Sequence, residues 1–143
     1  MSELKPILLA EDNPLDAELT LRAFAESGLV NRVDHVVDGV EVLEYLRRQG
    51  RFADREPGNP AVAILDLKMP RMDGIDALRE IRADPELCLL PVVILTSSRE
   101  DRDLLRSYQL GTNAYVVKPV QFSELIPAVK ELGLFWAMVN VAP

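Results

Sequence analysis

The sequence predicts an α/β domain in which five parallel strands form one sheet with helices on both faces. Four short, almost continuous apolar runs, at residues 7–10, 61–65, 91–95 and 114–117, have the length and composition of strands buried on both faces. Segments with apolar residues at helical spacing lie between these runs. Strands that alternate with helices indicate a parallel sheet, because parallel neighbours are joined by right-handed crossover connections.

A fifth strand is expected at residues 31–37, near an edge of the sheet, because Asp34 and His35 interrupt its apolar character. The start of the first helix is marked by Asn13 followed by Pro14, a pair typical of a helix N-terminus. The predicted order is therefore a strand and a helix, repeated five times. The helical segments are expected around residues 15–24, 42–46, 75–81, 104–110 and 122–134.

Length and charge narrow the class of protein. The 143 residues are a usual size for one domain, for which we expect a core at about residues 5–134 and an apolar tail at residues 135–143. The 16 basic and 23 acidic residues give a net charge of −7, which disfavours binding to nucleic acid. No apolar stretch reaches the roughly 18 residues that span a bilayer, and the N-terminus lacks the pattern of a signal peptide. We therefore expect a cytoplasmic protein that binds neither nucleic acid nor membranes.

Polar residues follow the apolar runs at the points where the predicted strands end. Glu11 and Asp12 follow the first run, Asp66 follows the run at 61–65, Thr96 the next run and Lys118 the last. Ligands of open α/β sheets bind outside the carboxyl ends of the strands. These side chains are therefore expected to form one site.

The chemistry of this set points to phosphoryl transfer. Three crowded carboxylates repel one another unless a cation lies between them, and an all-oxygen set suits Mg²⁺. A metal beside a free carboxylate and a lysine is what phosphoryl transfer requires. We expect Asp66 to be the nucleophile because it ends the central apolar run, with Asp12 and Glu11 placed to hold the metal. Lys118 would pair with Asp66 or with phosphate oxygens, to which Thr96 would donate a hydrogen bond.

Four motifs in this order resemble those of response-regulator receiver domains of the chemotaxis-regulator type, over about residues 5–134. They are LLAEDN, AILDLKMPRMDG, VVILTSS and AYVVKPV. The resemblance implies a doubly wound, flavodoxin-like receiver fold in which Asp66 accepts a phosphoryl group from a histidine kinase. It also implies that Asp12, Asp66 and the backbone carbonyl of Lys68 bind Mg²⁺, with help from Glu11 through water.

The resemblance further implies a switch. Thr96 and Lys118 would sense the phosphoryl group, Thr96 moving toward it while Tyr115 turns inward to fill the vacated space. Two residues depart from the usual pattern: Glu11 stands where aspartate is more usual, and Ser97 where alanine is frequent. These departures put the metal affinity and the phosphoryl lifetime in question.

Three segments resemble a subgroup of stand-alone receivers that partner phytochrome-type histidine kinases. They are the long loop at residues 49–60, the TSSRED segment and the C-terminal LGLFWAMVNVAP. Such a protein is a signalling protein rather than an enzyme, with output by protein contact, phosphate relay or dimerisation. The apolar tail around Trp136 has two interpretations, a partner surface or a segment folded back on the domain's own core.

Two other classes of function fit the sequence less well than a receiver does. An aspartyl-phosphate hydrolase needs a second acid in an Asp-x-Asp pattern, whereas Leu67 and Lys68 follow Asp66. A flavin or nucleotide carrier needs a Gly- or Ser/Thr-rich loop after the first strand, where this chain has the acidic AEDNPLD. Asp73 and Gly74 are assigned a structural role, as a turn and helix start.

Overall fold

Five parallel strands form one sheet in the computed structural model, which describes residues 5–26, 31–96 and 114–117. The strand order is β2-β1-β3-β4-β5, as in a doubly wound sheet. The predicted five-stranded parallel sheet is thus confirmed, including the edge position of residues 31–37. The strands are β1 (Ile7–Ala10), β2 (Val33–Val36), β3 (Val62–Asp66), β4 (Val92–Thr96) and β5 (Ala114–Val117).

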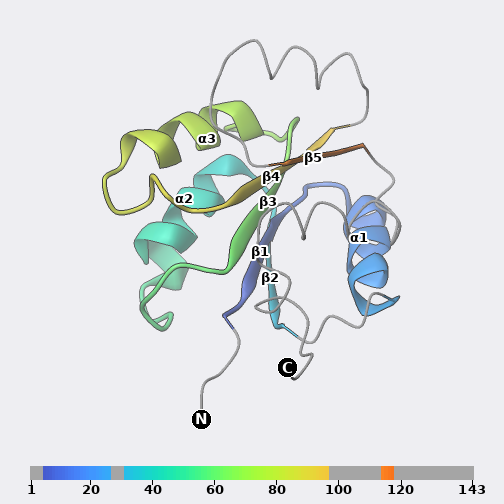
Figure 1. Ribbon diagram of the computed structural model, residues 1–143, viewed down its shortest axis with the longest axis horizontal. Helices are drawn as coiled ribbons and strands as arrows, with labels where there is room; N and C mark the ends of the chain where they lie inside the picture. Colours follow the sequence, from blue (N-terminus) through green and yellow to red (C-terminus); the bar gives the residue numbers. More distant parts are fainter. Residues whose placement is uncertain (1–4, 27–30, 97–113, 118–143) are drawn as a thin grey trace.

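Helices cover both faces of the sheet, with α2 and α3 on one side and α1 on the other (Figure 1). The helices expected at residues 104–110 and 122–134 lie outside the described residues. None of the helices within the described ranges is long and apolar enough to cross a membrane. The described helical elements are α1 (Pro14–Glu26), α2 (Gly39–Arg47), the short 3-10 helix η1 (Gly50–Phe52) and α3 (Gly74–Ala83).

Each described α-helix begins at a polar side chain that caps its first turn. The Asn13 side chain accepts hydrogen bonds from two backbone N–H groups of α1, at 2.9 and 3.1 Å. Asp38 and Asp73 accept one each at the starts of α2 and α3, at 2.9 and 2.8 Å. These bonds satisfy N–H groups that have no partner inside the helix, and Pro14 at the start of α1 has no N–H to satisfy. The capped helix starts all lie at the carboxyl edge of the sheet.

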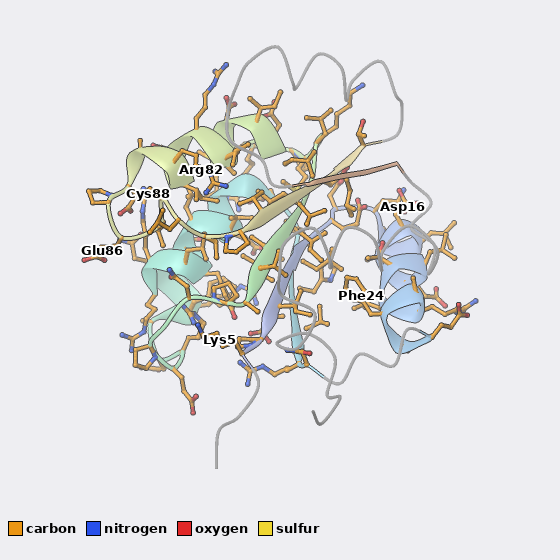
Figure 2. The ribbon with its side chains drawn as sticks, in the orientation of Figure 1. Lys5, Asp16, Phe24, Arg82, Glu86 and Cys88 are labelled. Atoms are coloured by element: carbon orange, nitrogen blue, oxygen red, sulfur yellow. The ribbon has the colours of Figure 1, made fainter. Side chains whose placement is uncertain are left out.

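The core explains why the strands are apolar throughout. Every residue of β1, β3 and β4 is buried, because helices or loops cover both faces. Phe24 of α1 is 3% exposed and points toward the sheet in Figure 2. The cluster on the other face joins strand residues Leu8, Ala10, Ala63, Leu65, Val92 and Ile94 to helix residues Val42, Leu43, Leu46, Ala77, Leu78 and Ile81.

Two arginines form hydrogen bonds between connecting segments and the helices. Arg82 of α3 donates to the carbonyls of Cys88 and Leu90, at 3.1 and 2.8 Å, and so holds the segment between α3 and β4 (Figure 2). Arg55, from the long loop at residues 49–60, donates to the carbonyl of Tyr45 at 2.9 Å. Its guanidinium lies 4.2 Å from the centre of the Tyr45 ring, a cation–π contact. The long loop is therefore packed against α2.

Tyr45 also joins α2 to the edge strand, and its hydroxyl offers a stability test. The hydroxyl donates a hydrogen bond to the Asp34 carboxylate at 2.6 Å. Burial and the hydrogen bond to Asp34 raise the pKa of Tyr45 to about 12, so the phenol stays protonated at neutral pH.

We predict that Tyr45→Phe lowers the free energy of unfolding by about 1–2 kcal/mol, because a hydrogen bond to a carboxylate is lost. Urea unfolding at pH 7 measures this change. Glu18→Gln, which breaks an exposed pair with Arg22, is the control and should cost less than about 0.5 kcal/mol. Equal losses in the two variants would contradict the prediction.

Candidate functional site

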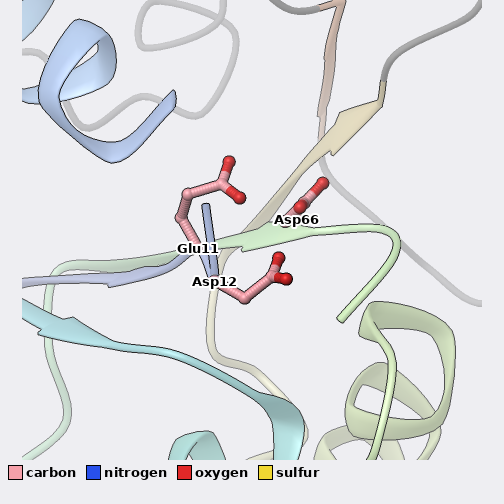
Figure 3. A group of neighbouring side chains, drawn as sticks. All are labelled: Glu11, Asp12 and Asp66. Atoms are coloured by element: carbon pink, nitrogen blue, oxygen red, sulfur yellow. The ribbon is translucent and has the colours of Figure 1, made fainter. Parts of the chain in front are cut away.

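Three carboxylates meet at the carboxyl edge of the sheet. Glu11 and Asp12 follow β1 directly, and Asp66 is the last residue of β3, which pairs with β1 through Ala10 and Leu65. One carboxylate oxygen from each of the three residues lies within 4.8 Å of the others (Figure 3). Glu11 is 0% exposed and Asp66 5%, whereas Asp12 is exposed to solvent. The structure therefore brings together the acidic residues that the sequence placed at one edge.

Backbone contacts fix the end of β1 where Glu11 sits. The N–H of Glu11 donates to the carbonyl of Val36 at 3.0 Å, and its side chain accepts from the N–H of Asn13 at 3.2 Å. Nε2 of His35 lies 2.7 Å from the Glu11 carbonyl oxygen. Since a carbonyl oxygen only accepts, the ring donates this bond from Nε2. Sequence reasoning gave His35 no part in the site, and nothing in the local sequence indicates this contact.

The acidic cluster fits a hard divalent cation. Its donors are all carboxylate oxygens, which Mg²⁺ and related ions prefer over softer ligands. Two of the three side chains are buried in the fold, while the exposed Asp12 leaves the outer side open to water ligands. A small divalent ion with two or three protein oxygens and several waters matches this arrangement.

The backbone around Asp66 is held closely. The N–H of Leu67 donates to the Leu95 carbonyl at 2.8 Å, and the N–H of Gly74 donates to the Leu67 carbonyl at 2.9 Å. A Cβ on Gly74 would collide with the carbonyl oxygen of Asp66. Asp73 caps α3, which confirms its predicted structural role. The start of α3 is thus packed directly on the backbone of the candidate nucleophile.

The remaining predicted site residues are placed only in part. Thr96 ends β4 and is 0% exposed; Asp66 pairs with Leu95, so Thr96 lies one position further along the same edge. Lys68 is exposed, two residues after Asp66. The backbone of Tyr115 belongs to β5, but its side chain is outside the described part of the chain. Lys118, Ser97 and the tail around Trp136 lie outside the described residues.

The fold is a doubly wound parallel sheet, and an acidic cluster surrounds the aspartate that ends its central strand. Together these two features define a class of metal-dependent signalling domains. The chain belongs to the response regulator receiver domain family, whose model matches residues 7–130. This match covers all five strands and the three carboxylates.

Several response regulators of this family are similar to the chain over nearly its whole length. The structure of the bacteriophytochrome response regulator RtBRR is 52% identical, with a TM-score of 0.92 over 99% of this chain and 85% of that one. The phosphorylated cyanobacterial phytochrome response regulator RcpA is 39% identical, with a TM-score of 0.75 over 94% of each chain. Response regulator Rcp1 of Synechocystis sp. is 33% identical over 97% of this chain and 93% of its own length. A structure of Rcp1 in a Mn²⁺-bound form gives a TM-score of 0.73 over 97% of this chain and 99% of that one.

The protein is therefore a two-component response regulator that is homologous to phytochrome response regulators. A phosphoryl-acceptor role follows from the family, as does the binding of a divalent metal. A histidine kinase is the implied partner.

The contact between Gly74 and Asp66 predicts whether an alanine at position 74 raises or lowers the free energy of unfolding. Gly→Ala in a helix ordinarily stabilises by up to about 1 kcal/mol. We predict that Gly74→Ala instead destabilises by about 1–3 kcal/mol, because the added methyl group collides with the Asp66 backbone. Thermal and urea unfolding would measure the change. A more stable variant would contradict the close packing of Gly74 on the Asp66 carbonyl.

Proposed function

We propose that Asp66 accepts the phosphoryl group from a histidine kinase, with Mg²⁺ held by Glu11, Asp12, Asp66 and the backbone carbonyl of Lys68. The observation that carries this proposal is the cluster of three carboxylate oxygens within 4.8 Å around Asp66 at the end of β3. The Mn²⁺-bound form of Rcp1 supports a divalent ion in a relative.

In the proposed reaction, a carboxylate oxygen of Asp66 attacks the phosphorus atom of a phosphohistidine. A new O–P bond forms, the P–N bond breaks, and its electron pair stays on the imidazole of the donor. Bound Mg²⁺ supplies charge neutralisation for the transferring phosphoryl group. Glu11 and Asp12 hold the ion beside Asp66, and Lys118 pairs with the phosphoryl oxygens. The burial of Asp66, which is 5% exposed, limits the access of water to the acyl phosphate.

The switch that follows is proposed to start at Thr96. Thr96 is 0% exposed and ends the strand beside β3, so a new dianion on Asp66 would change the electrostatics around its buried hydroxyl. We propose that Thr96 moves toward the phosphoryl group and that Tyr115 on β5 turns inward. The output is then phosphorylation-dependent protein contact or dimerisation. In this scheme Thr96 and Lys118 sense the phosphoryl group.

The protein is proposed to act as a signalling switch without turnover of small phosphoesters. Leu67 is apolar and 7% exposed at the position after Asp66, and Lys68 stands where a hydrolase would carry its second acid. Loss of the phosphoryl group is then slow self-hydrolysis.

The proposed partner is a phytochrome-type histidine kinase, because RtBRR and RcpA are phytochrome response regulators. A net charge of −7 supports a protein partner over nucleic acid. The proposed unit is a single receiver domain over residues 1–143, with its core at about 5–134, acting in the cytoplasm.

The site of phosphorylation can be tested with two matched aspartate substitutions. Asp66→Asn should abolish the gain of one phosphoryl group when the protein is incubated with Mg²⁺ and acetyl phosphate, because an amide is a poor nucleophile. Asp73→Asn, on the same loop, should still be phosphorylated, because asparagine also caps helices. Intact-mass spectrometry reads out both.

The outcomes separate the alternatives. Phosphorylation of Asp66→Asn would overturn the assignment of the acceptor. A wild-type protein that binds Mg²⁺ but gains no mass from acetyl phosphate would require the cognate kinase as donor, and failure with that donor too would overturn the proposed function.

Self-association is proposed to involve the C-terminal tail. Deletion of residues 136–143 is expected to weaken dimerisation by about tenfold or more, because the tail includes Trp136, Met138 and Val139 in an apolar segment. Sedimentation velocity of the phosphorylated protein would measure this. An unchanged sedimentation coefficient in the truncated protein would contradict a role for the tail in self-association.

A further inference from the structure

The loop between β3 and α3, residues 67–73, carries the proposed metal ligand, the Lys68 carbonyl, so this inference rests on the proposed function. Backbone bonds fix both ends of the loop: Leu67 to Leu95, at 2.8 Å, and Gly74 to Leu67, at 2.9 Å. Contacts from the start of α2, whose residues supply no ligand, hold the loop at Arg71 and Met72.

Two hydrogen bonds join the start of α2 to this loop, and a buried carboxylate makes one of them. Asp38 is 3% exposed; its Oδ1 accepts from the N–H of Glu41 and so caps α2, at 2.9 Å. Its Oδ2 accepts from Nε of Arg71 at 2.7 Å. Beside it, the N–H of Gly39 donates to the carbonyl of Met72 at 2.8 Å. A single side chain therefore ties the first turn of α2 to the loop that follows Asp66.

The backbone of the loop needs such support. Arg71 has φ 61°, in the left-handed region that residues with a side chain seldom adopt. Conformations of this kind persist where surrounding contacts hold them in place. Gly39 allows the close approach, because a Cβ there would lie 2.6 Å from the Met72 carbonyl oxygen. The strained turn is thus held from outside the loop.

The charge state of the pair agrees with this role. Burial by itself raises the pKa of the Asp38 carboxyl, but hydrogen bonds from Arg71 and from the Glu41 N–H outweigh burial and hold it below its usual value. The carboxylate is therefore ionised near neutral pH. Arg71 is more than half exposed, so water screens its charge, and the geometry of the contact matters more than its Coulomb energy.

We propose that the ion pair of Asp38 and Arg71 is a positioning element, which holds the β3–α3 loop so that the Lys68 carbonyl faces the acidic cluster ready for the metal. Partners that orient a ligand set the affinity of a metal site even though they do not touch the ion. The pair therefore sets Mg²⁺ affinity, while Asp66 retains its chemistry.

Two variants separate this role from helix capping and from backbone strain. Asp38→Asn keeps an acceptor for the Glu41 N–H but removes the charge that binds Arg71. Arg71→Gly removes the guanidinium and accepts a positive φ without strain. Arg71→Lys keeps the charge but not the guanidinium Nε, and Arg22→Ala, which removes an exposed pair on α1, is the matched control.

The test measures Mg²⁺ binding by calorimetry and, without metal, amide hydrogen exchange in the loop. Asp38→Asn and Arg71→Gly should each weaken Mg²⁺ binding by about tenfold. The double variant should be no weaker than either single one, because both break the same contact. Amide exchange should be faster at residues 68–72 in both single variants. Their rate of phosphorylation at saturating Mg²⁺ should stay within about twofold of wild type. Arg71→Lys should recover part of the Mg²⁺ affinity that Arg71→Gly loses. Arg22→Ala should match wild type in every measurement.

Each other outcome overturns the proposal in a distinguishable way. Mg²⁺ affinities within about twofold of a metal-binding wild type would refute the positioning role and leave the proposed function standing. A wild-type protein that binds no Mg²⁺ would overturn both. Faster exchange spread along α2 in Arg71→Gly, rather than confined to the loop, would show a general structural role instead.

Discussion

Mutual repulsion among Glu11, Asp12 and Asp66 is the constraint on which the rest of the structure depends. Three carboxylates within 4.8 Å, two of them nearly inaccessible to water, are unfavourable in a protein without a cation. The fold tolerates the arrangement because two adjacent, fully buried strands end there and hold the backbone rigidly. The stability of the sheet therefore offsets the electrostatic repulsion among the three carboxylates. A bound divalent ion would relieve this repulsion, so metal binding and folding are linked.

The support for this site comes from elements that do not belong to it. His35 on the edge strand binds the carbonyl of Glu11, and Asp38 at the start of α2 binds the loop after Asp66. His35 contacts the backbone carbonyl of Glu11, whereas Asp38 contacts the Arg71 side chain. Neither contact involves a carboxylate of the cluster, so both act on the position of the cluster and of its neighbouring loop. Under the proposed function, substitutions at these supporting residues would change metal affinity and leave the acceptor in place.

Much of this could be predicted from the sequence, because buried parallel strands leave continuous apolar runs and the polar residues that end them share one edge. The first run matches β1 at both ends, whereas β3 and β4 each start and end one residue later than predicted, since Asp66 and Thr96 still pair in the sheet. Asn13 and Asp73 were identified as helix starts because capping is local. The contacts of His35 and of Asp38 with Arg71 join residues 24 and 33 positions apart, and no local pattern encodes them.

The three capped helix starts have one more consequence. In a parallel sheet every helix begins where a strand ends, so α1, α2 and α3 all begin at the edge that carries Asp66. The partial positive charge of each helix N-terminus is a property of the aligned peptide dipoles and does not titrate. The winding of the chain therefore gives this edge a fixed positive contribution to its electrostatic potential, which partly offsets the three carboxylates and which no single side-chain substitution removes.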